Sequence, residues 1–311
     1  MSANPCELYR FDLSADSGRE PRRALQLADL AVEVLAAEAM LTPKPALVDG
    51  RGSGVHLDLD LSAMLKSASS LHGTFQSMAA AAAAGREPNQ TLREQLARIG
   101  RSGERCMFAA TGGSNAHRGA IWVLGLLVAA RAIQGDESAR GVTGPRAEAG
   151  TRETAALAAR IAAFPDRYAP AQDSHGVRAC RRYGVRGARG EAVDGFPHVI
   201  EVGLPAMWAA RANGADETCA RLDALMAIMA TLDDTCLLHR GGISALQAAQ
   251  RGARETLMAG GSSSAAGRRA LLRLDAELVK RNASPGGCAD LLAACIFLDS
   301  DHKRSASIGT R

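Results

Sequence analysis

Apolar residues recur every three or four positions along most of this 311-residue chain. That period places them on one side of an α-helix, whereas the apolar–polar alternation of a β-strand is almost absent. Aromatic residues, which β-sandwiches and barrels favour, make up only 4% of the chain. The sequence therefore predicts an all-α protein. Its expected helices span 22–41, 60–84, 90–107, 115–134, 151–163, 204–213, 215–239, 243–259, 265–281 and 288–298.

We expect a single compact multi-helix domain over 21–299, between a loose N-terminal arm at 1–20 and a C-terminal tail at 300–311. Two Gly-rich stretches interrupt the helical pattern, at 135–150 and 174–197, and each could be an interdomain linker. Because a similar composition resumes on both sides, we interpret them as surface loops of one domain. Gly-rich loops are expected to form a phosphate-binding cleft.

Charge and cysteine content exclude several classes of protein. The formal net charge is only +4, and no basic stripe is interleaved with aromatic residues, so nucleic acid is not an expected partner. No window approaches the ~20 apolar residues of a membrane span, and the N-terminus lacks the apolar core of a signal peptide. The seven cysteines are scattered without a metal-binding spacing. These observations predict a cytoplasmic protein with reduced thiols, for which assembly into a homo-oligomer is left open.

Two predicted helices each carry an acidic residue within their apolar face. Glu38 lies within about 60° of Leu27 on a helical wheel. On the helix predicted over 215–239, Asp233 lies in the middle of the apolar stripe, and Arg240 follows one heptad later. Burying an unpaired carboxylate is costly, so each acid needs a partner or a polar cleft. An Asp233–Arg240 ion pair is one alternative, but two such acids favour a cleft.

Three Gly-Gly pairs each stand before a predicted helix. The N-terminus of a helix exposes N–H groups and a positive dipole end, and glycine lets a phosphate approach that backbone closely. The alternative is that the pairs are merely turns between helices. None fits a P-loop or a dinucleotide-binding fingerprint, which excludes those kinases and dehydrogenases. The pairs are Gly112-Gly113, Gly241-Gly242 and Gly286-Gly287.

Three acids occupy the irregular segment after the first predicted helix. Asp49, Asp58 and Asp60, together with Glu38, could hold Mg²⁺, which prefers carboxylate and phosphate oxygens. The alternative is that these loop acids are simply solvated.

Five motifs, in order along 38–298, resemble those of the triphosphoribosyl-dephospho-CoA synthase family. Each motif alone would be weak, but together they are specific. They are Pro43-Lys44-Pro45-x-Leu47-Val48-Asp49 with Gly54-x-His56-x-Asp58-x-Asp60; Thr111-Gly112-Gly113-x-Asn115-x-His117-Arg118-Gly119; Gly187-Ala188-Arg189-Gly190-Glu191-Ala192 with Gly195-Phe196-Pro197; Asp233-Asp234-Thr235-x-x-Leu238-His239-Arg240-Gly241-Gly242; and Arg281-Asn282-x-Ser284-Pro285-Gly286-Gly287-x-Ala289-Asp290-Leu291-Leu292.

The resemblance implies an all-helical pentosyltransferase acting on ATP, expected with Mg²⁺, and on 3′-dephospho-CoA. It would release adenine and join the triphosphoribosyl group to the 2′-hydroxyl of dephospho-CoA. The product would be the prosthetic-group precursor for the acyl carrier subunit of malonate decarboxylase or citrate lyase, attached by a separate transferase. Ser114, Ala116 and Arg118, and the lack of a fused transferase domain, favour the malonate decarboxylase branch.

The resemblance also implies roles for individual residues. Asp233 or Asp234 would face the ribose as base or charge stabiliser, and Glu38 would be the other carboxylate. Arg189 and Glu191 would lie in a loop that closes over the site. The expected phosphate-binding and supporting residues are Lys44, Gly112, Gly113, Asn115, His117, Arg118, His239, Arg240, Gly241, Gly242, Asn282, Ser284, Gly286 and Gly287.

Other functions stay open at this level. The same helical scaffold could support a nucleotide N-glycohydrolase or another ribosyl transferase. A non-enzymatic helical binding protein is the further alternative, in which the Gly-Gly pairs are only turns. The Asp233-Asp234 pair lacks the third Asp of a prenyl transferase motif, because residue 237 is Leu.

Overall fold

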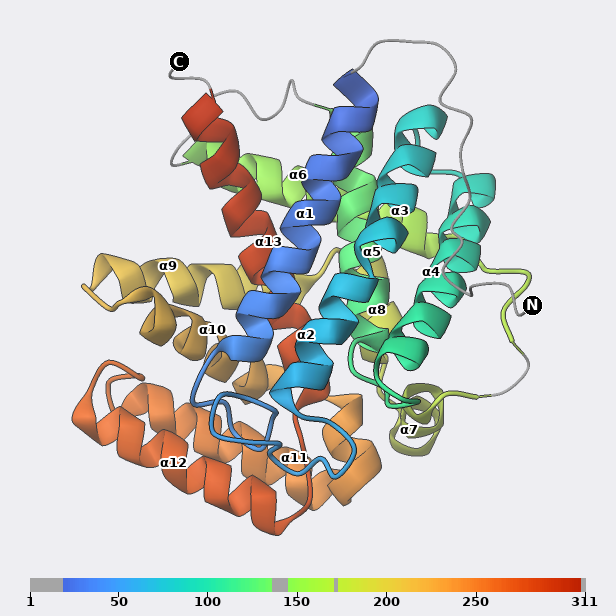
Figure 1. Cartoon of the computed structure of the whole chain (residues 1–311). Helices are drawn as coiled ribbons and strands as arrows, with labels where there is room; N and C mark the ends of the chain where they lie inside the picture. Colours follow the sequence, from blue (N-terminus) through green and yellow to red (C-terminus); the bar gives the residue numbers. More distant parts are fainter. Residues whose placement is uncertain (1–18, 136–144, 171–172, 309–311) are drawn as a thin grey trace. The chain divides into compact units, whose positions relative to one another are not determined.

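A computed structural model describes residues 19–135, 145–170 and 173–308. Its regular structure is helical (Figure 1), and within those ranges the β pairing is limited to an isolated bridge between Asp49 and Gly52. The predicted all-α class is confirmed. Of the predicted arm over 1–20, residues 1–18 lie outside the described residues, while Arg19 and Glu20 begin the first helix. The last three residues of the predicted tail also lie outside the described residues. The last helix continues through residues 300–308 of that predicted tail.

The contacts within the chain define two compact units. One contains the described residues up to Ala36, Ala63–Ala169 and those from Phe297 on; the other contains Ala37–Ser62 and Pro170–Ile296. The single-domain boundaries 21–299 stay a prediction. Three of the four boundaries between the units fall within helices, and the fourth follows Ala169. These helices are α1 (Arg19–Met40), α2 (Leu61–Ser70) and α13 (Gly286–Ile308).

In the first unit, a nearly all-apolar helix is enclosed by others. This helix, α5 (Arg118–Gln134), is buried along most of its length, as expected for a helix that is hydrophobic on all sides. Gly125 of α5 permits close packing, because a Cβ at that position would lie 2.7 Å from Sδ of Met78. Helices that pack together with α5 are α3 (His72–Gly85), α4 (Gln90–Ala110) and α6 (Pro145–Ala163).

The second unit is organised in the same way around α10 (Glu217–Thr231), whose residues are almost all buried. Small residues again set the helix spacing: a Cβ at Gly252 would lie 2.6 Å from Cδ1 of Leu274. The other helical elements are α7 (His175–Tyr183), α8 (Gly187–Val193), the π-helical turn η2 (His198–Gly203), α9 (Leu204–Ala212), α11 (Thr235–Met258) and α12 (Ala265–Lys280).

Side-chain caps explain where several of these helices begin. Asn89, Ser174, Asp216 and Ser264 each accept a hydrogen bond from a backbone N–H in the first turn of α4, α7, α10 and α12, respectively. Such caps satisfy donors that have no partner within the helix. The prediction of a loop over 174–197 is therefore wrong: Ser174 starts α7, and α8 follows within the same stretch.

Two predicted helices are interrupted. The segment 60–84 divides at Leu71 into α2 and α3. The segment 215–239 divides after Thr231, because Leu232 adopts an extended conformation (ψ 134°) and Asp234 caps a new helix. The apolar period continues across both breaks, which is why the sequence does not reveal them.

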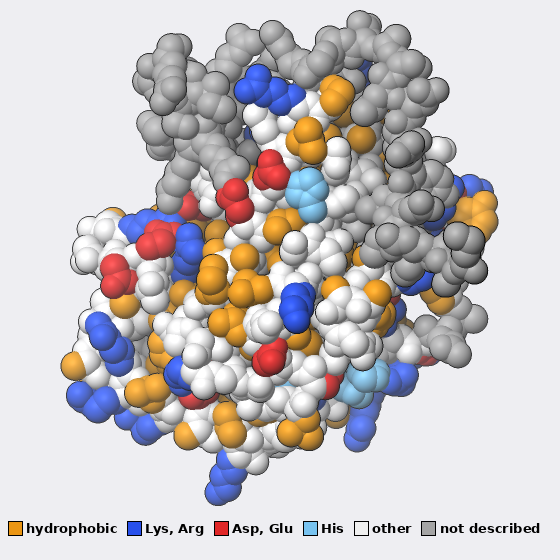
Figure 2. Space-filling model, in the orientation of Figure 1, with side chains coloured by type: hydrophobic (Ala, Val, Ile, Leu, Met, Phe, Trp, Pro, Cys, Tyr) orange, Lys and Arg blue, Asp and Glu red, His pale blue; other side chains and the backbone are white. Residues whose placement is uncertain are grey.

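The molecular surface mixes apolar and charged side chains. Figure 2 shows Lys and Arg side chains scattered over one face rather than gathered in a single patch. Among the described helices, none combines the length and the apolar character needed to cross a membrane.

Candidate active site

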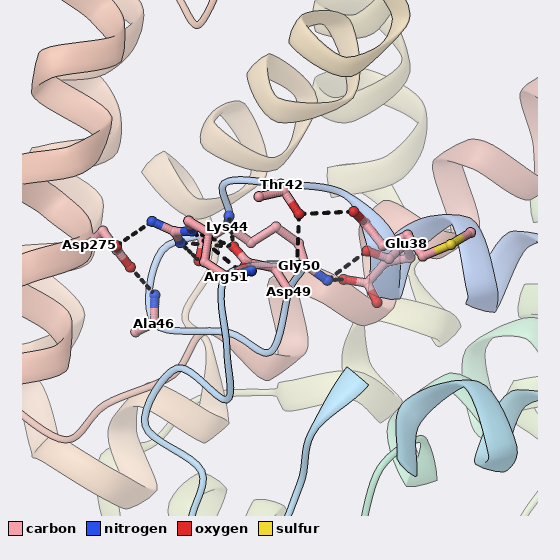
Figure 3. Close-up of polar contacts among 9 residues, drawn as sticks. Glu38, Thr42, Lys44, Ala46, Asp49, Gly50, Arg51 and Asp275 are labelled. Carbon is pink, nitrogen blue, oxygen red and sulfur yellow. Dashed lines mark hydrogen bonds and ion pairs between the residues drawn. The ribbon is translucent and has the colours of Figure 1, made fainter. Parts of the chain in front are cut away.

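The segment that follows α1 is held by a buried ion pair between Glu38 and Lys44. Figure 3 shows Lys44 directed at Glu38: its Nζ lies 2.7 Å from Oε1 and 2.6 Å from the backbone oxygen of Glu38. The exposed fractions of the two residues are 4% and 1%. The prediction that Glu38 faces inward is confirmed. Its partner is Lys44, so neither charge is presented to solvent.

Asp49 belongs to a second polar network in the same segment. Its Oδ2 accepts hydrogen bonds from the backbone N–H of Lys44 at 2.8 Å and from Nη2 of Arg51 at 2.8 Å. Arg51 also donates to Oδ2 of Asp275 at 2.7 Å, and the other oxygen of Asp275 accepts from the N–H of Ala46 at 2.8 Å (Figure 3). The network ties the segment to α12.

The three acids predicted to bind Mg²⁺ do not form one group. Asp49 is buried against Arg51, while Asp58 and Asp60 are exposed. In the described part of the chain, no three His, Cys, Asp or Glu side chains are arranged to hold a metal ion. Because Mg²⁺ commonly binds through one or two carboxylates and substrate phosphates, an exposed Asp58 or Asp60 still fits that chemistry.

Asp233 and Asp234 occupy a short turn between α10 and α11. Asp233 is exposed. The prediction that it faces the core is therefore wrong, because α10 ends at Thr231 and the helical wheel no longer applies. Asp234 is the buried acid, with 1% exposure. Its Oδ1 accepts hydrogen bonds from the backbone N–H groups of Cys236 at 2.7 Å and Leu237 at 3.3 Å.

The side chain of Asp234 also contacts the first turn of α13. Its Oδ2 accepts the backbone N–H of Cys288 at 2.9 Å. A Cβ on Gly287 would lie 3.1 Å from the Asp234 carboxylate, so glycine is what permits this approach. Burial raises the pKa of Asp234, while the three N–H donors favour the charged form. The anion at the Gly286-Gly287 helix start is thus a carboxylate of the protein itself.

Of the other two Gly-Gly pairs, Gly112-Gly113 differs from the prediction, whereas Gly241-Gly242 does precede a helical segment. Gly112 and Gly113 end α4, with positive φ angles of 66° and 101°, and α5 begins only at Arg118. The N–H of Gly113 bonds to the oxygen of Phe108 at 2.8 Å, which is a helix C-terminal arrangement. Gly242 has non-helical angles (φ 66°, ψ −163°) within α11, so a helical segment does start after it.

In the first unit, the predicted residues after Gly113 are engaged locally. Asn115 Oδ1 accepts the N–H of Arg118 at 3.2 Å, and Nε of Arg118 lies 3.1 Å from Glu104. His117 is 3% exposed, and its Nδ1 lies 2.7 Å from Oγ of Ser67. Asn115 and Arg118 reach the surface, whereas His117 is a buried packing residue.

A histidine that the sequence motifs did not include lies close to Asp233. His198 is held by Glu191, whose two carboxylate oxygens bond to its backbone N–H and its Nδ1, both at 2.8 Å. Glu191 itself is 7% exposed. The Glu191 hydrogen bond and charge, together with the charge of Asp233, raise the pKa of His198 against the effect of burial. Its position directly after the Gly195-Phe196-Pro197 motif was the signal available in the sequence.

Other basic side chains lie close to the predicted residues His239 and Arg240. The rings of His239 and His175 stack at 4.0 Å. Arg240 Nη2 lies 3.3 Å from Nδ1 of His56. Burial, and then the positive charges of His175, Arg178 and Arg240, lower the pKa of His239. His175 and Arg178 were missed because α7 was predicted to be a loop.

The remaining predicted residues have different exposures. Arg189 and Asn282 are exposed, and Asn282 has a positive φ of 50°. Ser284 is 2% exposed, so it does not present its hydroxyl to solvent. Gly241 packs closely inside α11, because a Cβ there would lie 3.3 Å from Cβ of Ala283.

Comparisons with a family model and with known proteins point to the same family. The model of the family described as ATP:dephospho-CoA triphosphoribosyl transferase matches residues 24–307. A Pseudomonas fluorescens protein named probable 2-(5''-triphosphoribosyl)-3'-dephosphocoenzyme-A synthase is 52% identical over 94% of this chain and 96% of its own length. A protein of the same name from Azotobacter vinelandii is 54% identical over 90% of this chain and 92% of its own length. Another from Pseudomonas aeruginosa PAO1 is 55% identical over 88% of this chain and 89% of its own length. No solved structure matches.

Proposed function

Because the chain belongs to the ATP:dephospho-CoA triphosphoribosyl transferase family, we propose that it joins the triphosphoribosyl group of ATP to the 2′-hydroxyl of 3′-dephospho-CoA and releases adenine. The observation that carries the proposal is the match over 24–307, together with 52% identity to a relative over almost its whole length. This function makes the chain a pentosyltransferase with ATP as substrate.

The reaction exchanges one bond at the anomeric carbon of the ATP ribose. The bond to adenine breaks, a bond to the 2′-oxygen of dephospho-CoA forms, the proton of that hydroxyl passes to a base, and an acid protonates the departing adenine. The transition state resembles an oxocarbenium ion, which a nearby carboxylate stabilises. A single displacement requires that the base and the ribose be held together while water is excluded.

Asp233 is the carboxylate best placed for this role. It is exposed, it stands between two helices, and it lies near His198. Asp234 supports it as the buried cap that fixes the turn. His198, held by Glu191, is a second group that can carry a proton near Asp233. Glu38 has a positioning role: its ion pair with Lys44 fixes the segment that continues to Asp58 and Asp60.

The phosphates are assigned to exposed basic groups. In the second unit these are His239 and Arg240, with Arg189 and Asn282 as further candidates. In the first unit, Asn115 and Arg118 at the start of α5 keep their proposed role. Mg²⁺ would accompany the ATP phosphates and bind through Asp58 or Asp60; no proton or bond-making step is assigned to it.

We assign the product to malonate decarboxylase, with a separate transferase attaching it to the acyl carrier subunit. Ser114, Ala116 and Arg118 support this branch over the citrate lyase branch. We also propose a cytoplasmic location, where both substrates would be available.

One incubation tests the proposed reaction. The protein is incubated with ATP and Mg²⁺, with and without 3′-dephospho-CoA, and free adenine is quantified by chromatography. Adenine that appears only with dephospho-CoA, together with a heavier CoA species, is the expected result. Adenine without the acceptor would indicate an N-glycohydrolase, and no adenine in either tube would contradict the enzymatic function.

A further inference from the structure

Four basic side chains come together where α7 meets α11. They are His175 and Arg178 from α7 and His239 and Arg240 from α11, here called the α7–α11 cluster. The rings of His175 and His239 stack with their centroids 4.0 Å apart and their planes at 25°. All four residues are exposed, so a ligand can reach them from solvent.

The two helices hold the cluster in a defined geometry. At one end of α7, a Cβ on Gly176 would lie 3.7 Å from Oγ1 of Thr235, the first residue of α11. Toward the other end, the hydroxyl of Tyr183 would lie 3.4 Å from a Cβ on Gly242. α7 therefore lies along the first turns of α11, and the histidines are positioned by two helices rather than by a loop.

Among the described residues, the charged groups that lower the pKa of His239 are basic. Burial is the largest cause of the lowered pKa of His239. The next causes are the charges of His175 and Arg178 on α7 and of Arg240 on α11. Arg240 in turn lies 3.3 Å from the ring of His56. Positive charges this close to His239 disfavour its protonation, and an anion bound among them would offset that effect.

We propose that the α7–α11 cluster binds the polyphosphate chain of the nucleotide and that its stacked imidazoles take up a proton as the ligand binds. The proposal rests on the proposed function for the identity of the ligand. Guanidinium groups match phosphate oxygens by paired hydrogen bonds, and a protonated imidazole adds a donor. The proton comes from the buffer and goes to an imidazole nitrogen; no covalent bond of the nucleotide changes.

Titration calorimetry with inorganic tripolyphosphate tests the proposal directly. Experiments at pH 7.0 in two buffers of different ionisation enthalpy give the number of protons taken up per ligand. The ligand's own protons cancel when variants are compared with the wild-type protein. We expect the wild type to take up more protons than His175→Asn, and His175→Asn and Arg178→Gln to bind tripolyphosphate at least tenfold more weakly.

Matched controls separate this effect from general loss of charge. His72→Asn on α3 and Arg273→Gln on α12 remove the same side-chain types elsewhere, and we expect both to retain wild-type affinity. Circular dichroism and the Tm of each variant establish folding. Equal affinity and equal proton uptake in wild type and His175→Asn would overturn the proposal.

The adenine assay distinguishes failure of this inference from failure of the proposed function. Adenine release that His175→Asn and Arg178→Gln leave unchanged would remove the cluster from the site while leaving the reaction in place. Tripolyphosphate binding with proton uptake in a protein that releases no adenine would retain the cluster and reject the reaction.

Discussion

The carboxylate of Asp234 caps α11 and at the same time accepts the N–H of Cys288 in the first turn of α13, at 2.9 Å. One buried side chain therefore joins the starts of two helices that are far apart in the sequence. The exposed Asp233 is its immediate neighbour, so the geometry of the proposed catalytic residue depends on this joint.

Removal of the Asp234 carboxylate should destabilise the protein strongly. In Asp234→Ala, three N–H groups lose their acceptor, and those of Leu237 and Cys288 are buried. We expect this to cost about 3 kcal/mol of the free energy of unfolding. Asp216→Ala removes an ordinary single cap from α10 and should cost about 1 kcal/mol. Urea denaturation of both variants measures the difference. Equal losses would mean that the contact with α13 contributes nothing.

Gly287→Ala tests the same joint from the other side. The new methyl group would lie 3.1 Å from the Asp234 carboxylate, whose hydrogen bonds leave it little room to move. We expect a lower Tm and reduced adenine release. Gly85→Ala is the matched control, because its Cβ would meet nothing within 4 Å. The explanation fails if both variants have the same Tm and activity.

The Glu38–Lys44 pair should behave as a buried pair whose members depend on each other. Loss of either charge leaves the other buried without a partner, so Glu38→Gln and Lys44→Met should each cost about 3–5 kcal/mol. The double variant Glu38→Gln/Lys44→Met should lose less than the sum of the two single variants. The exposed Glu277–Arg281 pair serves as a comparison, with an expected coupling of about 0.5 kcal/mol. Thermal unfolding of all variants provides the measurement, and additive losses would contradict coupling.

The Glu191–His198 interaction should make stability depend on pH. The pKa of His198 is raised in the folded protein, so this interaction contributes fully below the unfolded value near 6.5 and is lost as the pH rises through the folded value. Glu191→Gln should therefore lose more stability at pH 6 than at pH 9, by roughly 1 kcal/mol. Urea denaturation at both pH values tests this. Equal losses at both pH values would mean that the Glu191 carboxylate does not stabilise a protonated His198.

Asp233→Ala should abolish catalysis without affecting the fold. Its side chain is exposed, so the Tm should stay within a few degrees of the wild type. Loss of a base or charge-stabilising carboxylate should reduce adenine release by about 10²–10⁴-fold. Glu255→Ala, an exposed acid near the end of α11 in the second unit, is a control outside the proposed mechanism. Wild-type activity in Asp233→Ala would exclude Asp233 from the reaction.

The sequence by itself determined the helical class and many of the helix positions. The apolar period depends on neighbours within one helix, and it correctly placed Glu38 on a buried face. The ordered motifs also pointed to the family that the comparisons show. Helical periodicity depends on residues a few positions apart, and motif order is a property of the sequence itself. Neither depends on how the helices pack.

Tertiary structure decided which acid is buried. The apolar period continues through Asp233, so a helical wheel cannot detect that Asp234 begins a new helix. One of the three N–H groups bound by Asp234 belongs to Cys288, 54 residues away. Only helix packing brings those two together.

The same reason applies to the groups that sequence reasoning missed. Glu191 holds His198 because η2 follows α8 closely, and His175 meets His239 because α7 packs on α11. The residue types were visible in the sequence, but their neighbours were not. Charge, burial and hydrogen bonding between distant segments set what these side chains can do, and those quantities exist only once the chain has folded.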